Sequence, residues 1–266
     1  MALHKQIRNQ LLTNLSAQTN NGIEQLNNAL RLCAKWRSVL IQNTVLKHQG
    51  TIIHQGPFAG LNFLEQSAEG CHIAKLLGCY EQPLQPFIYE AIKRNYHTLL
   101  NIGCAEGFYA VGMARNMPDT HIMAYDINPK AQETCKLLAK KNSVDHLVSV
   151  NALFEPKDFE QYRQDKTLIL CDIEGNEAEL LDPELAPALK TMDLIVESHE
   201  VLIPGITKKL IQRFQESHQI TLVQDNGQRQ LEPMPEWFYQ LNHLDQLLAV
   251  WEWRTGPTPW LIMTAK

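Results

Sequence analysis

The segment Thr98-Leu99-Leu100-Asn101-Ile102-Gly103-Cys104-Ala105-Glu106-Gly107 passes from a short apolar run into a turn that contains two glycines. The apolar run predicts a buried strand over Thr98–Ile102, and the residues from Phe108 onward predict a helix. A tight turn between a strand and a helix lets the backbone approach a ligand closely, and the N-terminus of the helix adds partial positive charge. We therefore expect a cofactor site at this turn.

A second predicted strand, His121–Asp126, ends on an acidic residue that lies 23 positions after Gly103. A carboxylate at this place can accept the hydroxyl hydrogens of a ribose. A glycine-containing turn alone is often only a structural turn. Together with Asp126 it predicts a nucleoside cofactor.

From His97 to the C-terminus, short apolar runs alternate with helical stretches. Asn128 and Pro129 are typical of the start of a helix, which we expect to run to Lys141, and Pro204-Gly205 opens another. The remaining predicted strands are Leu147–Asn151, Thr167–Asp172, Met192–Glu197, Gln219–Val223 and Trp260–Thr264. The alternation predicts an α/β fold with a Rossmann-like, seven-stranded, mostly parallel sheet and helices on both faces, over residues 97–266.

Residues 1–96 are predicted to form an N-terminal helical extension and cap. Apolar residues with helical spacing stand on both sides of Gly22, at Leu3, Ile7, Leu11, Leu15, Leu26, Leu30, Cys33 and Leu40. This stripe is typical of a helical cap or a homodimer contact, and a partner-binding or membrane-surface helix is the alternative. Asn and Gln dominate the polar face, so we expect no membrane partner.

The composition narrows the class of protein. Apolar residues make up 44% of the 266 residues, and the formal net charge is −5. A chain of this length can bury a core without disulfides. Its net negative charge does not predict the basic surface that binds nucleic acid. The six cysteines show no metal-binding spacing, and no signal peptide or membrane-spanning run stands out. We expect a cytoplasmic protein with reduced thiols and no nucleic-acid partner.

The pattern of Gly103, Ala105 and Gly107 lacks the second glycine that a dinucleotide pyrophosphate requires. It resembles motif I of the class I S-adenosylmethionine-dependent methyltransferases. The resemblance implies that S-adenosylmethionine is the cofactor. It also implies the cofactor-binding residues Asn101, Gly103, Cys104, Ala105, Glu106, Gly107, Asp126, Ile127, Asn151, Ala152, Asp172, Tyr80 and Glu81.

Two further runs are similar to the FkbM-like methyltransferases. Asp172-Ile173-Glu174-Gly175-Asn176-Glu177 resembles their D-x-E-G-x-E signature, and Gly78-Cys79-Tyr80-Glu81 resembles a Gly-x-Tyr-Glu segment upstream of motif I. The similarity spans roughly residues 76 to 224. It implies methylation of a hydroxyl oxygen on a small-molecule or glycan acceptor.

This sequence departs from motif I at two positions. Asn101 stands where the family usually has an acid, and Ala105 replaces the middle glycine. Because of these changes, a catalytically inactive binding or scaffold protein on a methyltransferase fold is an alternative hypothesis. A nicotinamide-dependent oxidoreductase is the other enzyme class considered, and the missing pyrophosphate glycine disfavours it.

Candidate catalytic residues follow the fourth and fifth strands. His199 is the preferred general base for removal of a hydroxyl proton. Asp172 and Glu197 could instead hold Mg²⁺, which prefers oxygen ligands, and helix capping is the alternative role for these acids.

An aromatic insert between the last two strands contains Trp237, Trp251 and Trp253. The hypotheses for it are an acceptor lid or simple packing onto the sheet edge. Arg254, which follows it, is a candidate contact for an anionic substrate.

Overall fold

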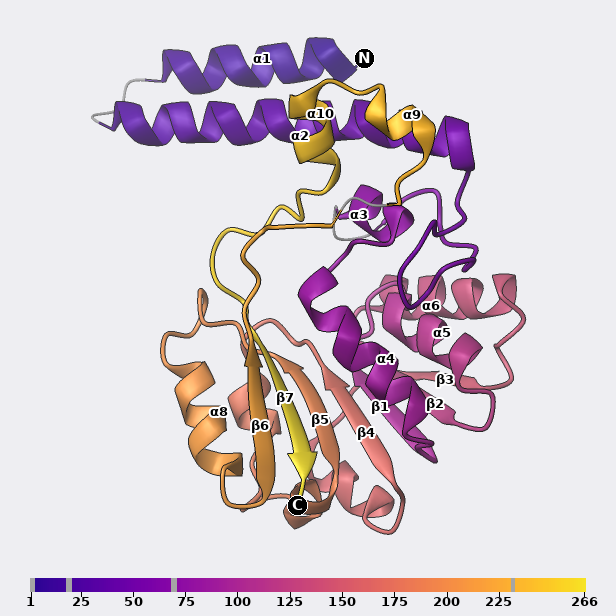
Figure 1. Ribbon diagram of the computed structural model, residues 1–266. Coiled ribbons are helices and arrows are strands. Elements are labelled where there is room, and N and C mark those ends of the chain that lie inside the picture. The colour runs from indigo at the N-terminus through magenta and orange to yellow at the C-terminus, as the bar shows by residue number, and fades with distance from the viewer. Residues whose placement is uncertain (1–2, 18–20, 68–70, 231–232) are drawn as a thin grey trace.

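The computed structural model describes residues 3–17, 21–67, 71–230 and 233–266, and its centre is one seven-stranded sheet (Figure 1). The strand order is β3-β2-β1-β4-β5-β7-β6. The strands are β1 (Thr98–Ile102), β2 (His121–Tyr125), β3 (Val148–Asn151), β4 (Thr167–Cys171), β5 (Asp193–Glu197), β6 (His218–Val223) and β7 (Trp260–Ala265). The predicted fold class is confirmed, and each predicted strand is found within one residue at either end.

The sheet is parallel from β3 to β5, and β7 runs antiparallel between β5 and β6. The chain order reverses between β1 and β4, which are direct neighbours. Ligands of open α/β sheets bind where the carboxyl ends of strands diverge at such a reversal. The turn after β1 and the residues after β4 therefore meet at the edge where a site is expected.

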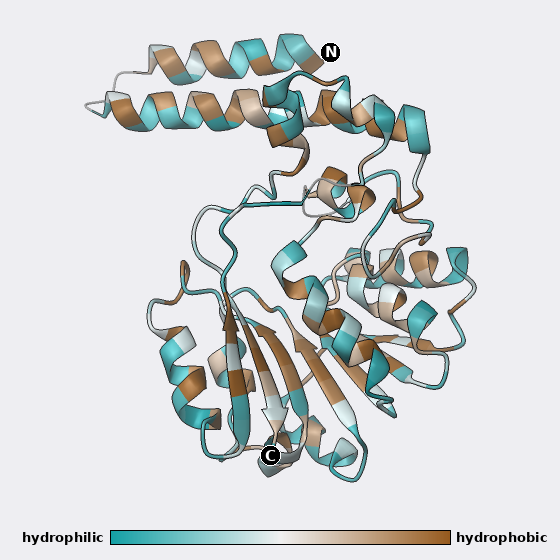
Figure 2. Cartoon of the chain, in the orientation of Figure 1, coloured by the Kyte–Doolittle hydropathy of each residue, from teal (hydrophilic) through white to brown (hydrophobic). Residues whose placement is uncertain are grey.

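Helices cover both faces of the sheet. The α-helices are α1 (Leu3–Ser16), α2 (Gly22–Gln49), α3 (His72–Leu77), α4 (Gln85–Lys93), α5 (Phe108–Asn116), α6 (Pro129–Lys141), α7 (Glu177–Leu180), α8 (Ile206–Phe214), α9 (Glu236–Tyr239) and α10 (His243–Ala249). Short 3₁₀ turns are η1 (Gln82–Leu84), η2 (Pro156–Tyr162) and η3 (Pro187–Thr191). One apolar core packs α3 to α6 on one face, and a second packs α7, η3 and α8 on the other. In Figure 2 the strands are mainly hydrophobic, as expected for a sheet covered on both faces.

Local signals position two of these helices. The side chain of Asn128 accepts a hydrogen bond from the N–H of Lys130, and Pro129 occupies the first turn of α6. Glu200 accepts hydrogen bonds from the N–H groups of Gly205 and Thr207 at the start of α8. Glu200 is therefore a capping residue, which is the structural alternative considered for the acids in this region.

The N-terminal extension differs from the expected cap in one respect. The hairpin of α1 and α2 projects past the body of the molecule (Figure 1), and α1 has no buried residue. In α2 the buried residues begin at Ser38. The apolar stripe packs on the core only in the second half of α2, because α10 and the aromatic insert reach only that half.

The aromatic insert packs onto α2. Trp237 stacks on His48 with ring centroids 5.2 Å apart, and Lys35 lies 4.9 Å from the ring centroid of Trp253. These contacts favour packing over the acceptor-lid hypothesis, although the partner is α2 and not the sheet edge. In the described residues, none of the helices is both long and apolar enough to cross a bilayer.

Candidate functional site

The turn after β1 lies directly against the end of β4. Gly103 has a φ of +81°, and a Cβ atom built there would lie 1.6 Å from the carbonyl oxygen of Asp172. The N–H groups of Gly103 and Cys104 both donate to the carbonyl oxygen of Tyr125 at 2.9 Å. Position 103 requires glycine because any side chain would separate the two strand ends.

The carboxylate of Asp126 is fixed by two backbone donors. Its Oδ2 accepts from the N–H of Ala105 at 2.9 Å, and its Oδ1 accepts from the N–H of Asn128 at 2.8 Å. Ala105 has a φ of 45°, so it adopts the left-handed conformation despite its side chain. Asp126 thus ties the glycine turn to the end of β2, and further lone pairs remain on its oxygens for ligand hydroxyls.

A cavity of about 630 Å³ lies along this edge of the sheet. Its volume suits a small-molecule ligand. The predicted site residues that line it are Gly103, Asp126, Ile127, Ala152 and Asp172. These residues come from the turns after β1, β2, β3 and β4, so the tertiary structure brings four sequence signals to one place.

The charged residues that line the cavity are all acidic. They are Asp126, Glu155, Asp172, Glu174 and Glu179. The other lining residues are largely apolar and include Ile102, Tyr125, Leu153, Phe154 and Leu180. Glu155 pairs with Nζ of Lys157 at 2.6 Å, but no cationic side chain lines the cavity itself. This excess of carboxylates in the lining favours a ligand that carries positive charge and disfavours a phosphate.

The remaining predicted cofactor residues do not line this cavity: Asn101, Cys104, Ala105, Glu106, Gly107, Asn151, Tyr80 and Glu81. Asn101 is 1% exposed, and its Oδ1 has no hydrogen-bond partner among the described residues. A buried acceptor without a partner is costly, so this oxygen is available to a donor on a ligand.

Glu106, which was predicted as a cofactor-binding residue, pairs with other side chains of the chain. Its carboxylate lies 2.6 Å from Nζ of Lys75 and 2.6 Å from Oγ of Ser67. Burial disfavours the charged carboxylate, but the Lys75 charge and these hydrogen bonds outweigh it and lower the pKa of Glu106. Glu106 therefore joins α3 to the glycine turn through a buried ion pair and does not face the cavity.

Glu81 and Glu197 belong to a buried ionic network. Nη2 of Arg254 lies 2.5 Å from Oε1 of Glu81, and Nη1 bonds to Glu197. Glu81 also accepts from the hydroxyl of Tyr109. Burial and the charge of Glu197 raise the pKa of Glu81 to about 8.

This network changes two expectations. Glu197 is 3% exposed and pairs with Arg254, so it does not join Asp172 as a metal ligand. Arg254 lies within 4 Å of the carboxyl groups of Glu81, Glu197, Asp225 and Glu252. The guanidinium is already paired inside this network, so it does not present a free positive charge to an anionic substrate.

His199 meets three acids from the run after β4. Its Nδ1 lies 2.6 Å from Oε1 of Glu177, and its Nε2 lies 3.5 Å from Oδ1 of Asp172 and 3.4 Å from Oε2 of Glu174. One ligand atom each from Asp172, Glu174 and His199 lies within 4.8 Å of the others. The cluster replaces the predicted pair of Asp172 and Glu197 as the group that could hold a cation.

The His199 ring is 4% exposed and does not itself line the cavity. Burial lowers its pKa, but the hydrogen bond to Glu177 and the charges of Glu197 and Glu174 outweigh this effect and raise it. With Nδ1 donating to Glu177, the neutral ring would turn its Nε2 lone pair toward two carboxylates. Either a second proton or a cation is needed to relieve that repulsion.

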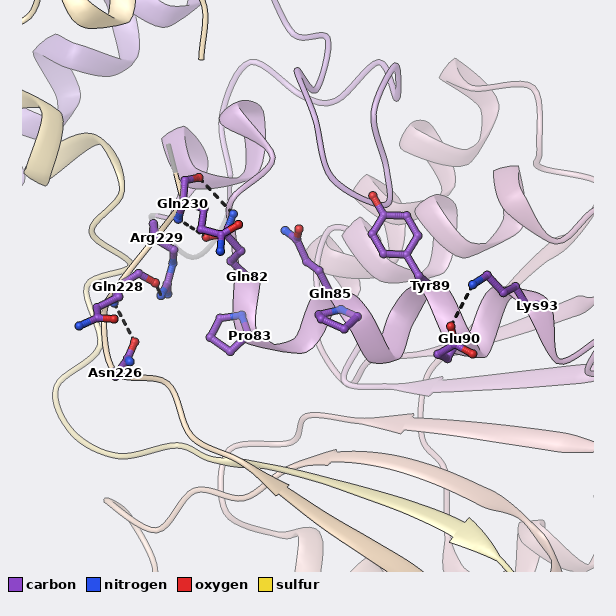
Figure 3. Close-up of a pocket in the computed structure, with 11 residues that line it drawn as sticks. Gln82, Pro83, Gln85, Tyr89, Glu90, Lys93, Asn226, Gln228, Arg229 and Gln230 are labelled. Atoms are coloured by element: carbon purple, nitrogen blue, oxygen red, sulfur yellow. Dashed lines mark hydrogen bonds and ion pairs between the residues drawn. The ribbon is translucent and has the colours of Figure 1, made fainter. Parts of the chain in front are cut away.

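A separate open groove of about 850 Å³ lies between α4 and the segment 226–230 (Figure 3). It shares no lining residue with the cavity. The Gln82 carboxamide donates to the carbonyl oxygen of Gln230 and accepts from its N–H. Arg229 lies here too and pairs with Asp225 and Glu252. The two hydrogen bonds between Gln82 and Gln230 hold the start of the aromatic insert against η1.

The sheet order, the glycine turn and the acid after β2 are those of a Rossmann-like fold. The model of the O-methyltransferase family matches residues 91–178. This segment extends from the end of α4 to the start of α7, and it contains the glycine turn, Asp126 and Asp172. No curated protein matches the chain.

Solved structures of methyltransferases resemble the chain at low identity. The O-methyltransferase TomG of Streptomyces achromogenes, solved with SAM, is 15% identical with a TM-score of 0.47, covering 72% of this chain and 82% of that one. The O-methyltransferase of Bacillus cereus, solved with SAH, is 12% identical with a TM-score of 0.42, covering 70% and 90%. The ribosomal protein L11 methylase of Lactobacillus delbrueckii subsp. bulgaricus is 17% identical with a TM-score of 0.46, covering 70% and 78%.

Sequence reasoning missed two contacts of this site. The partnership of Lys75 with Glu106 had one signal, a single lysine inside the apolar run His72–Leu77. Glu177 was noted only as the last residue of the D-x-E-G-x-E run, and its contact with His199 spans 22 residues. No spacing rule connects the start of α7 with the segment after β5.

Proposed function

We propose that the protein is an S-adenosylmethionine-dependent methyltransferase that acts on a hydroxyl oxygen of a small molecule or sugar. The observation that carries the proposal is the charge of the cavity beside Asp126, whose charged lining residues are all acidic. S-adenosylmethionine carries a sulfonium and an ammonium group, both positive. A nicotinamide dinucleotide would place its pyrophosphate against the same carboxylates, which disfavours the oxidoreductase alternative.

The residues present fit this cofactor. Gly103 provides a close backbone approach that a Cβ would fill, and Asp126 supplies oriented carboxylate oxygens for ribose hydroxyls. The orphaned Oδ1 of Asn101 can accept a hydrogen bond from the ammonium group in place of the usual acid. When bound, the cofactor supplies a methyl group on a sulfur that leaves as a neutral thioether.

The catalytic assignment rests on the residues after β4 and β5. Transfer to oxygen requires alignment of the acceptor and removal of its proton. Asp172 lines the cavity, and Nε2 of His199 lies 3.5 Å from its Oδ1. We assign to Asp172 and His199 the removal of the proton from the acceptor hydroxyl. Glu177 holds the imidazole ring in place through Nδ1.

A divalent cation is the second way in which this cluster could activate a hydroxyl. Two carboxylate oxygens and one imidazole nitrogen form a donor set that suits Mg²⁺ or Mn²⁺. Glu174 reaches the cluster from a left-handed backbone conformation, with a φ of 54°. The bound cation would lower the pKa of the acceptor hydroxyl.

The choice of a hydroxyl acceptor draws on the family match over residues 91–178. The D-x-E-G-x-E resemblance of Asp172 to Glu177 supports the same acceptor atom and an FkbM-like reaction. Three of the side chains in that run, those of Asp172, Glu174 and Glu177, surround His199.

The test is a calorimetric titration of the purified protein with S-adenosylmethionine, S-adenosylhomocysteine and NADH. We expect micromolar binding of the adenosyl ligands, no binding of NADH, and loss of at least about tenfold in affinity in Asp126→Ala. Asp119→Ala is the matched control, because Asp119 is an exposed acid in the turn before β2.

Thermal denaturation of each variant shows that the fold is retained. If the folded wild-type protein binds neither adenosyl ligand, the methyltransferase proposal is wrong. The inactive binding or scaffold protein then becomes the better hypothesis.

A further inference from the structure

The outer half of α2 carries an exposed apolar seam. Ile23 is 75% exposed, Leu26 is 65% exposed and Leu30 is 68% exposed, and Cys33 is exposed as well. Their spacing of three, four and three residues is that of the a and d positions of a coiled coil. Such a seam is typical of a surface that packs against another helix.

The same face of α2 is covered farther along by α10 of the same chain. Arg37, the next residue in the a/d series, forms an ion pair with Asp245 at 2.6 Å, and the buried Ile41 lies at the adjoining e position. α1 runs alongside α2 (Figure 1), and the hydrogen bonds between Asn14 and Gln25 place it on a face outside the seam. The described residues therefore cover this face from Arg37 onward and leave it open from Ile23 to Cys33.

The residues that flank the open seam suit a helix as its occupant. The e and g positions are Gly22, Asn27, Ala29 and Ala34, which are small or uncharged. The charged residues of this stretch, Glu24 and Arg31, lie at b positions, away from the centre of the seam. Two copies of this seam can approach without like charges facing each other.

We propose that the open seam pairs with the same seam of a second copy of this chain, in antiparallel orientation. A two-fold axis near Asn28 sets Leu26 against Leu30 of the second copy and Ile23 against Cys33 of the second copy.

The position of α10 decides the orientation. In the antiparallel arrangement the second copy's α2 begins opposite Ala34, just before the region that α10 covers, so the two helices lie end to end along one face. In a parallel arrangement the α10 helices of both copies would meet between the two α2 helices. A helix is about 10 Å across, so the seams could not close.

Disulfide trapping tests the register. We expect Ile23→Cys to form a covalent dimer with the native Cys33 upon mild oxidation, and the control Ile23→Cys/Cys33→Ser to remain monomeric on a non-reducing gel. Glu24→Cys, one position away and facing outward, is the matched control for random collision. Covalent dimers of wild type or of Ile23→Cys/Cys33→Ser would indicate a parallel pair and overturn the proposed orientation.

Light scattering of the full chain tests the association itself. We expect twice the mass of 30.4 kDa at tens of micromolar protein, and a dissociation constant raised at least about 100-fold in Leu26→Glu. Because Leu26 lies outside the cavity, this variant should bind S-adenosylmethionine like wild type. A wild-type monomer at that concentration would overturn the proposal, and binding of that monomer to anionic vesicles would assign the seam to a lipid surface.

Discussion

The Glu177 carboxylate accepts a hydrogen bond from Nδ1 of His199 at 2.6 Å, although Glu177 is fully buried at the start of α7 and His199 follows β5. The same Oε1 accepts from the N–H of Gly175 at 3.0 Å. Burial opposes the charge of Glu177, but these hydrogen bonds outweigh it and lower its pKa. Glu177 therefore fixes the plane of the imidazole and leaves Nε2 directed at Asp172 and Glu174.

The first prediction concerns this positioning contact. Glu177→Ala should weaken Mn²⁺ binding by about 10–100-fold, because partners that orient a ligand histidine contribute on this scale. Glu177→Gln keeps an acceptor for Nδ1 and should retain most of the affinity. Electron paramagnetic resonance of Mn²⁺ measures both. Equal loss in the two variants would show that the negative charge of Glu177, and not ring orientation, is what matters.

The second prediction concerns the cation ligands themselves. His199→Gln and Glu174→Gln should each reduce Mn²⁺ affinity by at least about tenfold, because each removes one of three donors. Glu184→Gln, an exposed acid outside the cluster, is the matched control. If the wild-type protein binds no Mn²⁺ at millimolar concentration, the cation role is wrong. Removal of the hydroxyl proton is then assigned to Asp172 and His199 alone.

The third prediction concerns the close approach at the glycine turn. Gly103→Ala should abolish adenosyl-ligand binding and destabilise the fold, because its Cβ would overlap the carbonyl oxygen of Asp172. Gly227→Ala is the control, since Gly227 has a φ of +73° but no atom within 4 Å of the added Cβ. Gly227→Ala should lower the free energy of unfolding only by the conformational strain, about 1–2 kcal/mol. Chemical denaturation compares the two, and equal losses would contradict the close-contact argument.

The fourth prediction concerns the buried pair of Lys75 and Glu106, whose side chains are 3% and 0% exposed. Glu106→Gln should lower the free energy of unfolding by about 3–5 kcal/mol at pH 7, because it leaves the Lys75 ammonium without that carboxylate. Lys75→Met/Glu106→Gln should be less destabilised than Glu106→Gln, because it removes both charges. Urea denaturation measures these changes.

The same pair predicts an acid dependence. The pKa of Glu106 is lower in the folded protein than its ordinary value of 4.5. Its stabilising contribution is therefore complete above pH 4.5 and decreases as the pH falls through the folded pKa. Wild-type stability should decline over this interval more steeply than that of Glu106→Gln. Parallel curves would assign the decline to other carboxylates.

The sequence by itself determined the sheet and the place of the cavity. Short apolar runs predicted the strands, and Asn128 and Pro129 predicted the start of α6. Gly103 and Asp126 predicted the two turns that meet at the cavity. These features depend on periodicity and on backbone conformations that neighbouring residues dictate, so they can be recognised locally.

The tertiary structure alone decided which charged groups pair. Glu106 and Glu197 stand near the expected site in sequence, yet Lys75 and Arg254 bind them across 31 and 57 residues. The sequence indicated only that one face of α2 is apolar. The position of α10 showed that half of this face is uncovered. Helical spacing reports that a face is apolar but not what covers it, because burial and charge pairing depend on which distant segments the folded chain brings together.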